Sequence, residues 1–74
     1  MHNRLRVLRA ERGWSQERLG TELGVSRQTI NSIEQGKYDP SLKVAFLLAH
    51  TFDCRIEDLF TPPMPTMREG SHLA

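Results

Sequence analysis

The sequence predicts an all-α fold: a compact domain of five short helices followed by a proline-rich tail. Apolar residues recur at helical spacing, and no segment shows the two-residue alternation of a half-buried strand. Serines and glycines stand where helix caps are expected. The chain of 74 residues suffices for one domain. We place this domain at residues 1–60 and a flexible tail at residues 61–74, because three prolines near the start of the tail exclude a continuing helix.

The first helix is predicted over residues 3–12, with Asn3 as its N-cap and Gly13 at its end. Its two leucines are three residues apart and would face the core, while arginines fill most of the remaining positions. Trp14 follows the glycine directly. We expect its large side chain to lie in the core between helices.

Two further helices follow, with a link of about three residues between them. Ser15 and Ser26 stand where an N-cap hydroxyl would accept a backbone N–H. Gly24 stands where the first helix of the pair must stop, and glycine takes a positive φ without strain. So short a link suits a steep crossing of the two helices. We place the second of the pair at residues 27–35, closed by Gly36.

The fourth helix is predicted from the N-cap Ser41 to about Phe52, and a short fifth helix spans residues 56–60. The fourth helix is apolar nearly all round, which is typical of a helix buried on more than one side. One stripe would face the core of its own chain, namely Leu42, Ala45, Leu48, Ala49 and Phe52.

The other apolar residues of these two helices suggest a homodimer interface. The alternative is that one or two of them pack beneath the fifth helix within one chain. The residues that we assign to the interface are Val44, Phe46, Leu47, Leu59 and Phe60.

The composition, with 38% apolar and 26% charged residues, favours a soluble globular protein. No apolar run approaches the roughly 20 residues of a membrane-spanning helix, and the N-terminal segment lacks the apolar stretch of a signal peptide. We therefore expect a cytoplasmic protein without a membrane partner. Residues 1–37 hold seven Lys/Arg and four Asp/Glu, whereas residues 38–74 hold three and five. The basic half suggests a polyanion partner or, equally, an ordinary solvated surface.

Catalysis and metal binding find little support. His2, His50 and His72 are scattered, and Cys54 stands alone, so no pair has the spacing of metal ligands. We expect no catalytic residue, no metal and no cofactor.

The outward face of the third helix is mostly amides and hydroxyls, whereas solvated helix faces usually carry Glu and Lys. Amides and hydroxyls donate and accept hydrogen bonds, which suits base edges in the major groove of DNA. The alternative is an ordinary polar surface. The outward residues are Arg27, Gln28, Thr29, Asn31 and Ser32.

The stretch SQERLGTELGVSRQTINSIEQGKYDPSL resembles the Cro and lambda-repressor-like helix-turn-helix domain of bacterial and phage transcription regulators. The resemblance covers roughly residues 3–60 and is strongest to small stand-alone members. It implies a sequence-specific regulator of double-stranded DNA, a repressor in preference to an activator, that acts as a homodimer with its third helix in the major groove. The matching positions are Ser15-Gln16, Leu19, Gly24-Val25-Ser26, Ile30, Ile33-Glu34, Gly36 and Pro40-Ser41-Leu42.

The resemblance also implies roles for single residues. Arg27, Gln28 and Ser32 would face bases, with Thr29 and Asn31 at the edges of that contact. Gln16 would bind a phosphate and brace Gln28. The implied contacts to the DNA backbone are Ser15, Gln16, Gln35, Lys37, Lys43 and Tyr38, although Tyr38 could instead pack under its loop.

Two more features follow from the resemblance. Arg9 and Glu34 would form an ion pair that joins the first and third helices, unless both are solvated. The chain departs from the family at Gly20, where Ala is usual, at Asp53, where Gly is frequent, and at Arg55, where the fifth helix often has a Ser or Thr cap.

A function of another class stays open. The chain could be an antitoxin-like or protein-interaction module whose helix face binds a partner protein. Salt would separate the two, because phosphate contacts make affinity fall steeply with ionic strength. Of the three functions considered, a DNA-binding regulator, a protein-interaction module and an enzyme, the sequence supports an enzyme least.

Overall fold

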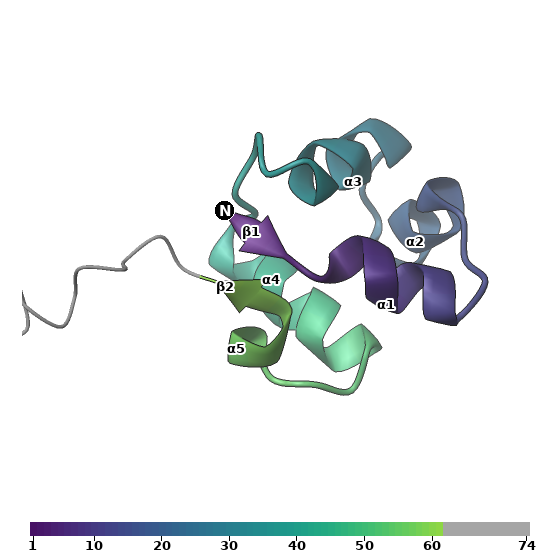
Figure 1. The fold of residues 1–74 in the computed structure, drawn as a ribbon. Coiled ribbons are helices and arrows are strands. Elements are labelled where there is room, and N and C mark those ends of the chain that lie inside the picture. Colours follow the sequence, from purple (N-terminus) through teal and green to yellow (C-terminus); the bar gives the residue numbers. More distant parts are fainter. Residues whose placement is uncertain (62–74) are drawn as a thin grey trace, which may run out of the picture.

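Figure 1 shows the computed structural model, which describes residues 1–61 as five helices and two very short strands. The all-α prediction is confirmed apart from these strands. Residues 62–74, and with them nearly all of the expected tail, lie outside the described residues. The elements are β1 (His2–Asn3), α1 (Leu5–Glu11), α2 (Gln16–Leu23), α3 (Arg27–Glu34), α4 (Leu42–Thr51), α5 (Ile56–Leu59) and β2 (Phe60–Thr61).

The helix starts follow from serine caps. The hydroxyls of Ser15, Ser26 and Ser41 each accept the backbone N–H three residues later, at 2.9, 3.0 and 3.2 Å. Gly24 ends α2 at φ +76°, a backbone conformation that costs glycine little. The helix boundaries on either side of the turn were therefore correctly predicted.

The turn between α2 and α3 is tight because Gly20 carries no side chain. A Cβ at this position would lie 2.6 Å from the carbonyl oxygen of Val25, well inside van der Waals contact. The backbone of α2 therefore lies directly against the segment that leads into α3, and Gly20 is buried.

The core lies where the five helices meet, and its six largest fully buried side chains come from every helix. Leu42 is wrong as a core residue, since 69% of its surface is exposed. It stands directly after the cap of α4, where the first turn extends beyond the core. Trp14 is half-buried at the edge of the core rather than inside it. The fully buried set is Leu5, Leu19, Ile30, Ile33, Leu48 and Leu59.

The short β-ladder was not predicted. β1 and β2 pair antiparallel, with His2 opposite Thr61 and Asn3 opposite Phe60. Strands of two residues are too short to show any alternation of apolar and polar residues. The ladder ends α5 at Leu59, one residue earlier than expected.

The ladder also delays the start of α1. Asn3 belongs to β1, and Arg4 takes the N-cap position that we assigned to Asn3. The side chain of Asn3 still serves the helix start, because its Oδ1 accepts the backbone N–H of Leu5 at 3.1 Å. Its Nδ2 donates to the carbonyl of Ile33 at 2.9 Å, which ties the N-terminal segment to α3.

Among residues 1–61, no helix combines the length and the apolar character that a membrane crossing requires.

Candidate nucleic-acid interface

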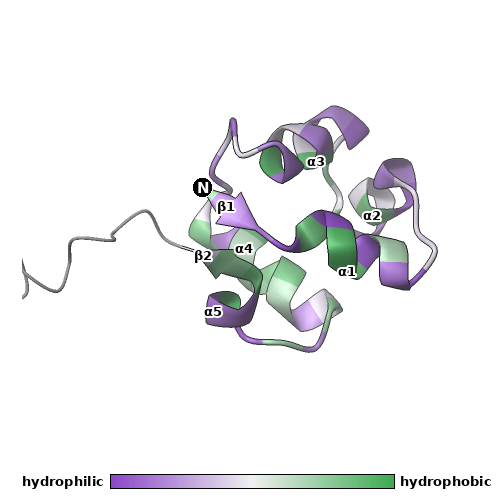
Figure 2. Cartoon of the chain, viewed as in Figure 1, coloured by the Kyte–Doolittle hydropathy of each residue, from purple (hydrophilic) through white to green (hydrophobic). Residues whose placement is uncertain are grey.

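The outer surface of α3 is polar, and its inner surface is apolar. Ile30 and Ile33 are fully buried, whereas Arg27 and Gln28 are exposed and Thr29, Asn31 and Ser32 are half-buried. Figure 2 shows hydrophilic colours on the outer side of α3 and hydrophobic colours toward the other helices. Gln28, Thr29 and Ser32 line one hollow on this outer surface, whereas Asn31 lines a second hollow, toward α1 and α2.

A shallow hollow of about 290 Å³ lies on this surface. Tyr38 belongs to the loop after α3, yet it helps to line the hollow and remains half-exposed. Its ring is therefore beside the outer residues of α3, rather than wholly packed under its loop. The residues around the hollow are Ser26, Gln28, Thr29, Ser32 and Tyr38.

The Arg9–Glu34 ion pair lies beneath the other side of α3. Arg9 Nε and Nη2 donate to the two carboxylate oxygens of Glu34 at 2.6 and 3.1 Å. The side chains are only 15% and 4% exposed, so the solvated alternative is excluded in this structure. The hydrogen bond to Glu34 is the main cause that raises the pKa of Arg9 above its usual value. Arg9 also donates to the carbonyl of Trp14 at 2.8 Å, so it joins α1, α3 and the segment before α2.

Gln16 does not brace Gln28, contrary to the expectation. Its side-chain nitrogen donates to Asn31 Oδ1 and to Glu34 Oε1, both at 3.0 Å. The buried carboxylate of Glu34 can accept more hydrogen bonds than Arg9 donates, and the Gln16 side chain at the start of α2 donates one of them. Gln35 donates to the same oxygen of Asn31 at 3.2 Å. Sequence spacing could not show this, because Gln16 and Glu34 are 18 residues apart.

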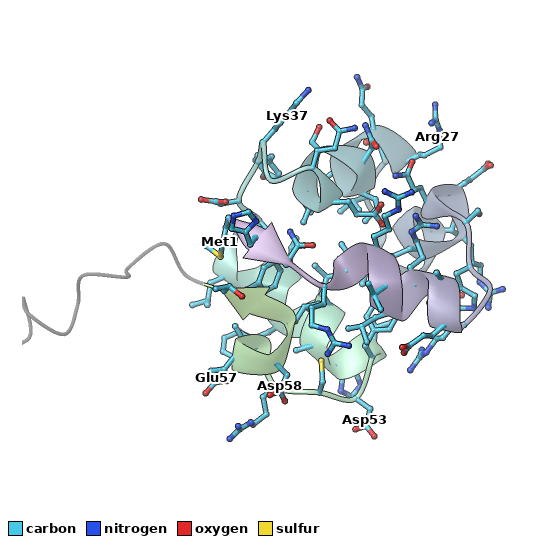
Figure 3. All side chains as sticks on the ribbon, in the orientation of Figure 1. Met1, Arg27, Lys37, Asp53, Glu57 and Asp58 are labelled. Carbon is cyan, nitrogen blue, oxygen red and sulfur yellow. The ribbon has the colours of Figure 1, made fainter. Side chains whose placement is uncertain are left out.

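The cationic candidates have no partner that neutralises them within the described chain. Arg27, Lys37 and Lys43 take part in none of the ion pairs among residues 1–61. Figure 3 shows Arg27 and Lys37 extending from the α3 side of the molecule. The acidic residues that it labels on and near α5, Asp53, Glu57 and Asp58, lie at the opposite side. The α3 surface is therefore the more favourable side for a polyanion.

A family model described as helix-turn-helix matches residues 5–59, most of the chain. The chain belongs to this helix-turn-helix family. The match spans α1 to α5, so it includes the α2–turn–α3 unit that carries the polar surface. The resemblance to Cro and lambda-repressor-like regulators is confirmed, and this helix-turn-helix protein is a DNA-binding transcription regulator by family.

Relatives of similar length occur in archaea and bacteria. A protein named as an uncharacterized HTH-type transcriptional regulator of Methanocaldococcus jannaschii is 57% identical over 60 residues, which cover 81% of this chain and 91% of that protein. The Bacillus subtilis regulator YgzD is 47% identical over 60 residues, with 81% and 91% of the two chains covered.

Two solved structures share the fold. The restriction-modification controller protein C.AhdI from Aeromonas hydrophila has a TM-score of 0.68 and 37% identity, over 77% of this chain and 83% of that chain. A hypothetical transcription factor, NHTF from Neisseria, has a TM-score of 0.70 and 25% identity, over 88% and 73% of the two chains.

The α4 face of this helix-turn-helix protein carries exposed apolar side chains. Phe46 is 57% and Leu47 37% exposed, and Val44 is half-buried. Leu59 and Phe60 are instead buried in the core of their own chain, so they offer little surface to a partner. An open groove of about 590 Å³ adjoins Phe46 and includes residues of α5 and the segment before it.

Metal ligands are not gathered in the described part of this helix-turn-helix chain, where no group of three or more His, Cys, Asp or Glu could hold an ion. Cys54 is half-buried beside the α4–α5 groove, and burial raises the pKa of its thiol. A raised pKa keeps the thiol protonated and less reactive, which fits a packing role.

Proposed function

We propose that this regulator is a sequence-specific repressor that binds double-stranded DNA as a homodimer, with α3 in the major groove. The observation that carries the proposal is the α3 surface itself. It combines uncharged amides and hydroxyls at its centre with Arg27 and Lys37 extending from the same side. A major groove admits one helix and presents donors and acceptors that such side chains match.

Gln28 is the central base contact in this proposal. It lies in the first turn of α3 after the cap Ser26, the part of a recognition helix that contacts base edges. Its exposed amide forms no side-chain hydrogen bond to the other described residues, so it can donate and accept together, as adenine N6 and N7 require. Arg27 and Ser32 complete the central contact, with Thr29 and Asn31 at its edges. The Thr29 hydroxyl also lies 2.9 Å from Ser26 Oγ, which limits its freedom.

The backbone contacts would surround this centre. Ser15 stands at the N-terminus of α2, where backbone N–H groups and the helix dipole favour a phosphate. Lys37 and Lys43 supply charge, and Gln35 and Tyr38 supply polar groups near the end of α3 and the loop after it. These contacts orient the domain and contribute affinity without reading sequence.

Assembly as a homodimer follows from the exposed apolar side chains of α4. Phe46 and Leu47 would meet the same residues of a second copy, with Val44 at the edge. Two copies related by a two-fold axis bind half-sites about one helical turn, roughly 34 Å, apart. A dimer that covers both half-sites would block access to a promoter, which is why we favour repression. The controller-protein neighbour is compatible with control of transcription by a domain of this size.

The same apolar surface favours a second candidate, a module that binds a partner protein. In that case the occupant of the groove of about 590 Å³ beside Phe46 would be a different chain. Such an interface would depend little on ionic strength, unlike phosphate contacts.

Selection of bound sequences from a random duplex pool tests the proposal, followed by affinity measurement at about 50 and about 200 mM salt. We expect one enriched palindromic motif and a loss of affinity of roughly 10³-fold across that salt range, which corresponds to about six phosphate contacts. No enrichment, together with salt-independent binding of a protein partner, would contradict it.

A further inference from the structure

A directed chain of hydrogen bonds leads from the buried ion pair to the surface of α3. Its fixed point is Glu34, whose carboxylate only accepts hydrogen bonds. Arg9 occupies both of its oxygens, at 2.6 and 3.1 Å. The group of Gln16 that lies 3.0 Å from Glu34 Oε1 must therefore be the NH2 group and not the carbonyl.

The orientation of the Gln16 amide also determines the orientation of the Asn31 amide. The same nitrogen of Gln16 lies 3.0 Å from the Asn31 side chain, so Asn31 must turn its carbonyl oxygen inward to accept. Gln35 donates to this oxygen as well, at 3.2 Å. A carbonyl oxygen has two lone pairs, and both are thus occupied.

We propose that the Arg9–Glu34 ion pair makes Asn31 a donor-only contact to DNA, with Gln16 and Gln35 as positioning residues. The inference rests on the proposed function. Because its oxygen is occupied, Asn31 offers only N–H groups to a ligand. It cannot form the donor-and-acceptor pair with adenine that Gln28 can form. Its partner must be a hydrogen-bond acceptor, either a phosphate oxygen or an acceptor on a base edge such as guanine O6 or N7 or thymine O4.

The surroundings of Asn31 suit an acceptor. Asn31 lines an open polar hollow of about 270 Å³ at the junction of α1, α2 and α3. Arg6 lines the same hollow and takes part in none of the ion pairs among residues 1–61. The charge of Arg9 is compensated by Glu34, so Arg6 supplies the positive potential there. Arg6 would therefore attract the DNA group that accepts from Asn31, without a direct hydrogen bond between Arg6 and Asn31.

Side-chain amide NMR of isotope-labelled protein, with and without the selected duplex, tests the direction of the chain. In the free protein, the Gln16 NH2 group should exchange slowly with water, because two acceptors hold it, and the Asn31 NH2 group should exchange fast. The duplex should shift and protect the Asn31 NH2 group and leave that of Gln16 unchanged. A fast-exchanging Gln16 amide in the free protein would overturn the inference whether or not DNA binds. An Asn31 amide that ignores a duplex which shifts other α3 resonances would also overturn it and leave the proposed function standing.

Two substitutions at one position test the donor-only role. Asn31→Asp has nearly the same shape and still accepts from Gln16 and Gln35, but it turns an acceptor outward. Asn31→Ala removes the group. We expect Asn31→Asp to bind the selected duplex at least about tenfold more weakly than Asn31→Ala, since it places two acceptors face to face. Thr21→Asp and Thr21→Ala, at an exposed position of α2, control for the added charge and should differ much less. Equal affinities of the two Asn31 variants would count against the inference.

Pool selection with Asn31→Ala distinguishes whether Asn31 donates to a base edge or to a phosphate oxygen. A lost preference for guanine or thymine at one position of each half-site indicates a base edge, and a uniform loss of affinity indicates a phosphate oxygen. A lost preference for adenine over guanine would overturn the donor-only assignment, because both purines present the N7 acceptor and only a side chain that also accepts can select the N6 amino group of adenine.

Discussion

Arg9 holds Glu34 through two hydrogen bonds, from Nε at 2.6 Å and from Nη2 at 3.1 Å, and the two side chains are only 15% and 4% exposed. This relationship joins α1 to α3 across 25 residues of sequence. It fixes the inner side of α3 and, through Glu34, determines which way the Gln16 and Asn31 amides face. The stability of the domain and the orientation of the Asn31 amide at the α3 surface therefore both depend on this one pair of side chains.

Removing one member of this pair should destabilise the domain strongly. Arg9→Met or Glu34→Gln should lower the free energy of unfolding by about 3–5 kcal/mol, because the remaining partner stays buried without compensation. That loss corresponds to a melting temperature at least about 12 °C lower in a domain of this size. Thermal denaturation measures it.

The exposed pair Arg55–Asp58, at 3.6 Å, supplies the matched control. Arg55→Met should cost less than about 1 kcal/mol. Melting temperatures of the Arg9 and Glu34 variants as close to the parent as that of Arg55→Met would contradict the buried pair.

A strained backbone position offers a stabilising substitution. Asp53 takes φ +53° after the end of α4. The left-handed conformation costs a residue with a side chain about 1–2 kcal/mol, and a glycine avoids that cost. Glycine in turn destabilises the fold by about 0.5–1 kcal/mol, because it loses more conformational entropy on folding. Asp53→Gly should therefore raise the free energy of unfolding by about 0.5–1 kcal/mol. Denaturant titration of Asp53→Gly beside the parent and Asp53→Ala checks this, and a Gly variant no more stable than the parent would disprove it.

Local signals in the sequence predicted most of the helical architecture. The caps Ser15, Ser26 and Ser41 act through backbone amides three residues away, and Gly24 acts through its own φ, so each can be read from a few neighbours. The β-ladder could not be read in this way, because it joins the two ends of the described chain through strands of two residues.

In the candidate site, too, the sequence predicted what neighbouring residues determine and missed what contacts between distant segments determine. The outward position of Gln28 follows from helical periodicity once Ile30 and Ile33 face the core. The partners of Gln16 do not follow, because an amide chooses among acceptors that only the packing of α2 against α3 brings near. Leu59 and Phe60 were assigned to a partner interface because sequence pattern separates apolar from polar residues but cannot tell which apolar surface the chain itself covers.

The proposed homodimer predicts a concentration-dependent mass. Sedimentation at micromolar concentration should show a dimer, and Leu47→Glu should shift it toward monomer because a charge would enter the apolar contact of α4. Val7→Glu, at an exposed apolar position of α1, is the matched control and should leave the dimer intact. A parent protein that sediments as a monomer at all concentrations would rule out assembly through this face.

The central claim is that α3 reads DNA sequence through Gln28, whereas Lys37 contributes charge alone. Random-pool selection with Gln28→Ala and with Lys37→Ala tests it most directly. Gln28→Ala should lose the preference at one position of each half-site, equivalent to about 1–3 kcal/mol of discrimination. Lys37→Ala should return the parent motif with weaker binding to every sequence and a salt slope lower by about one unit. If Gln28→Ala instead returns the parent motif unchanged, with only a uniform loss of affinity, then Gln28 does not read a base and the account of the α3 surface is wrong.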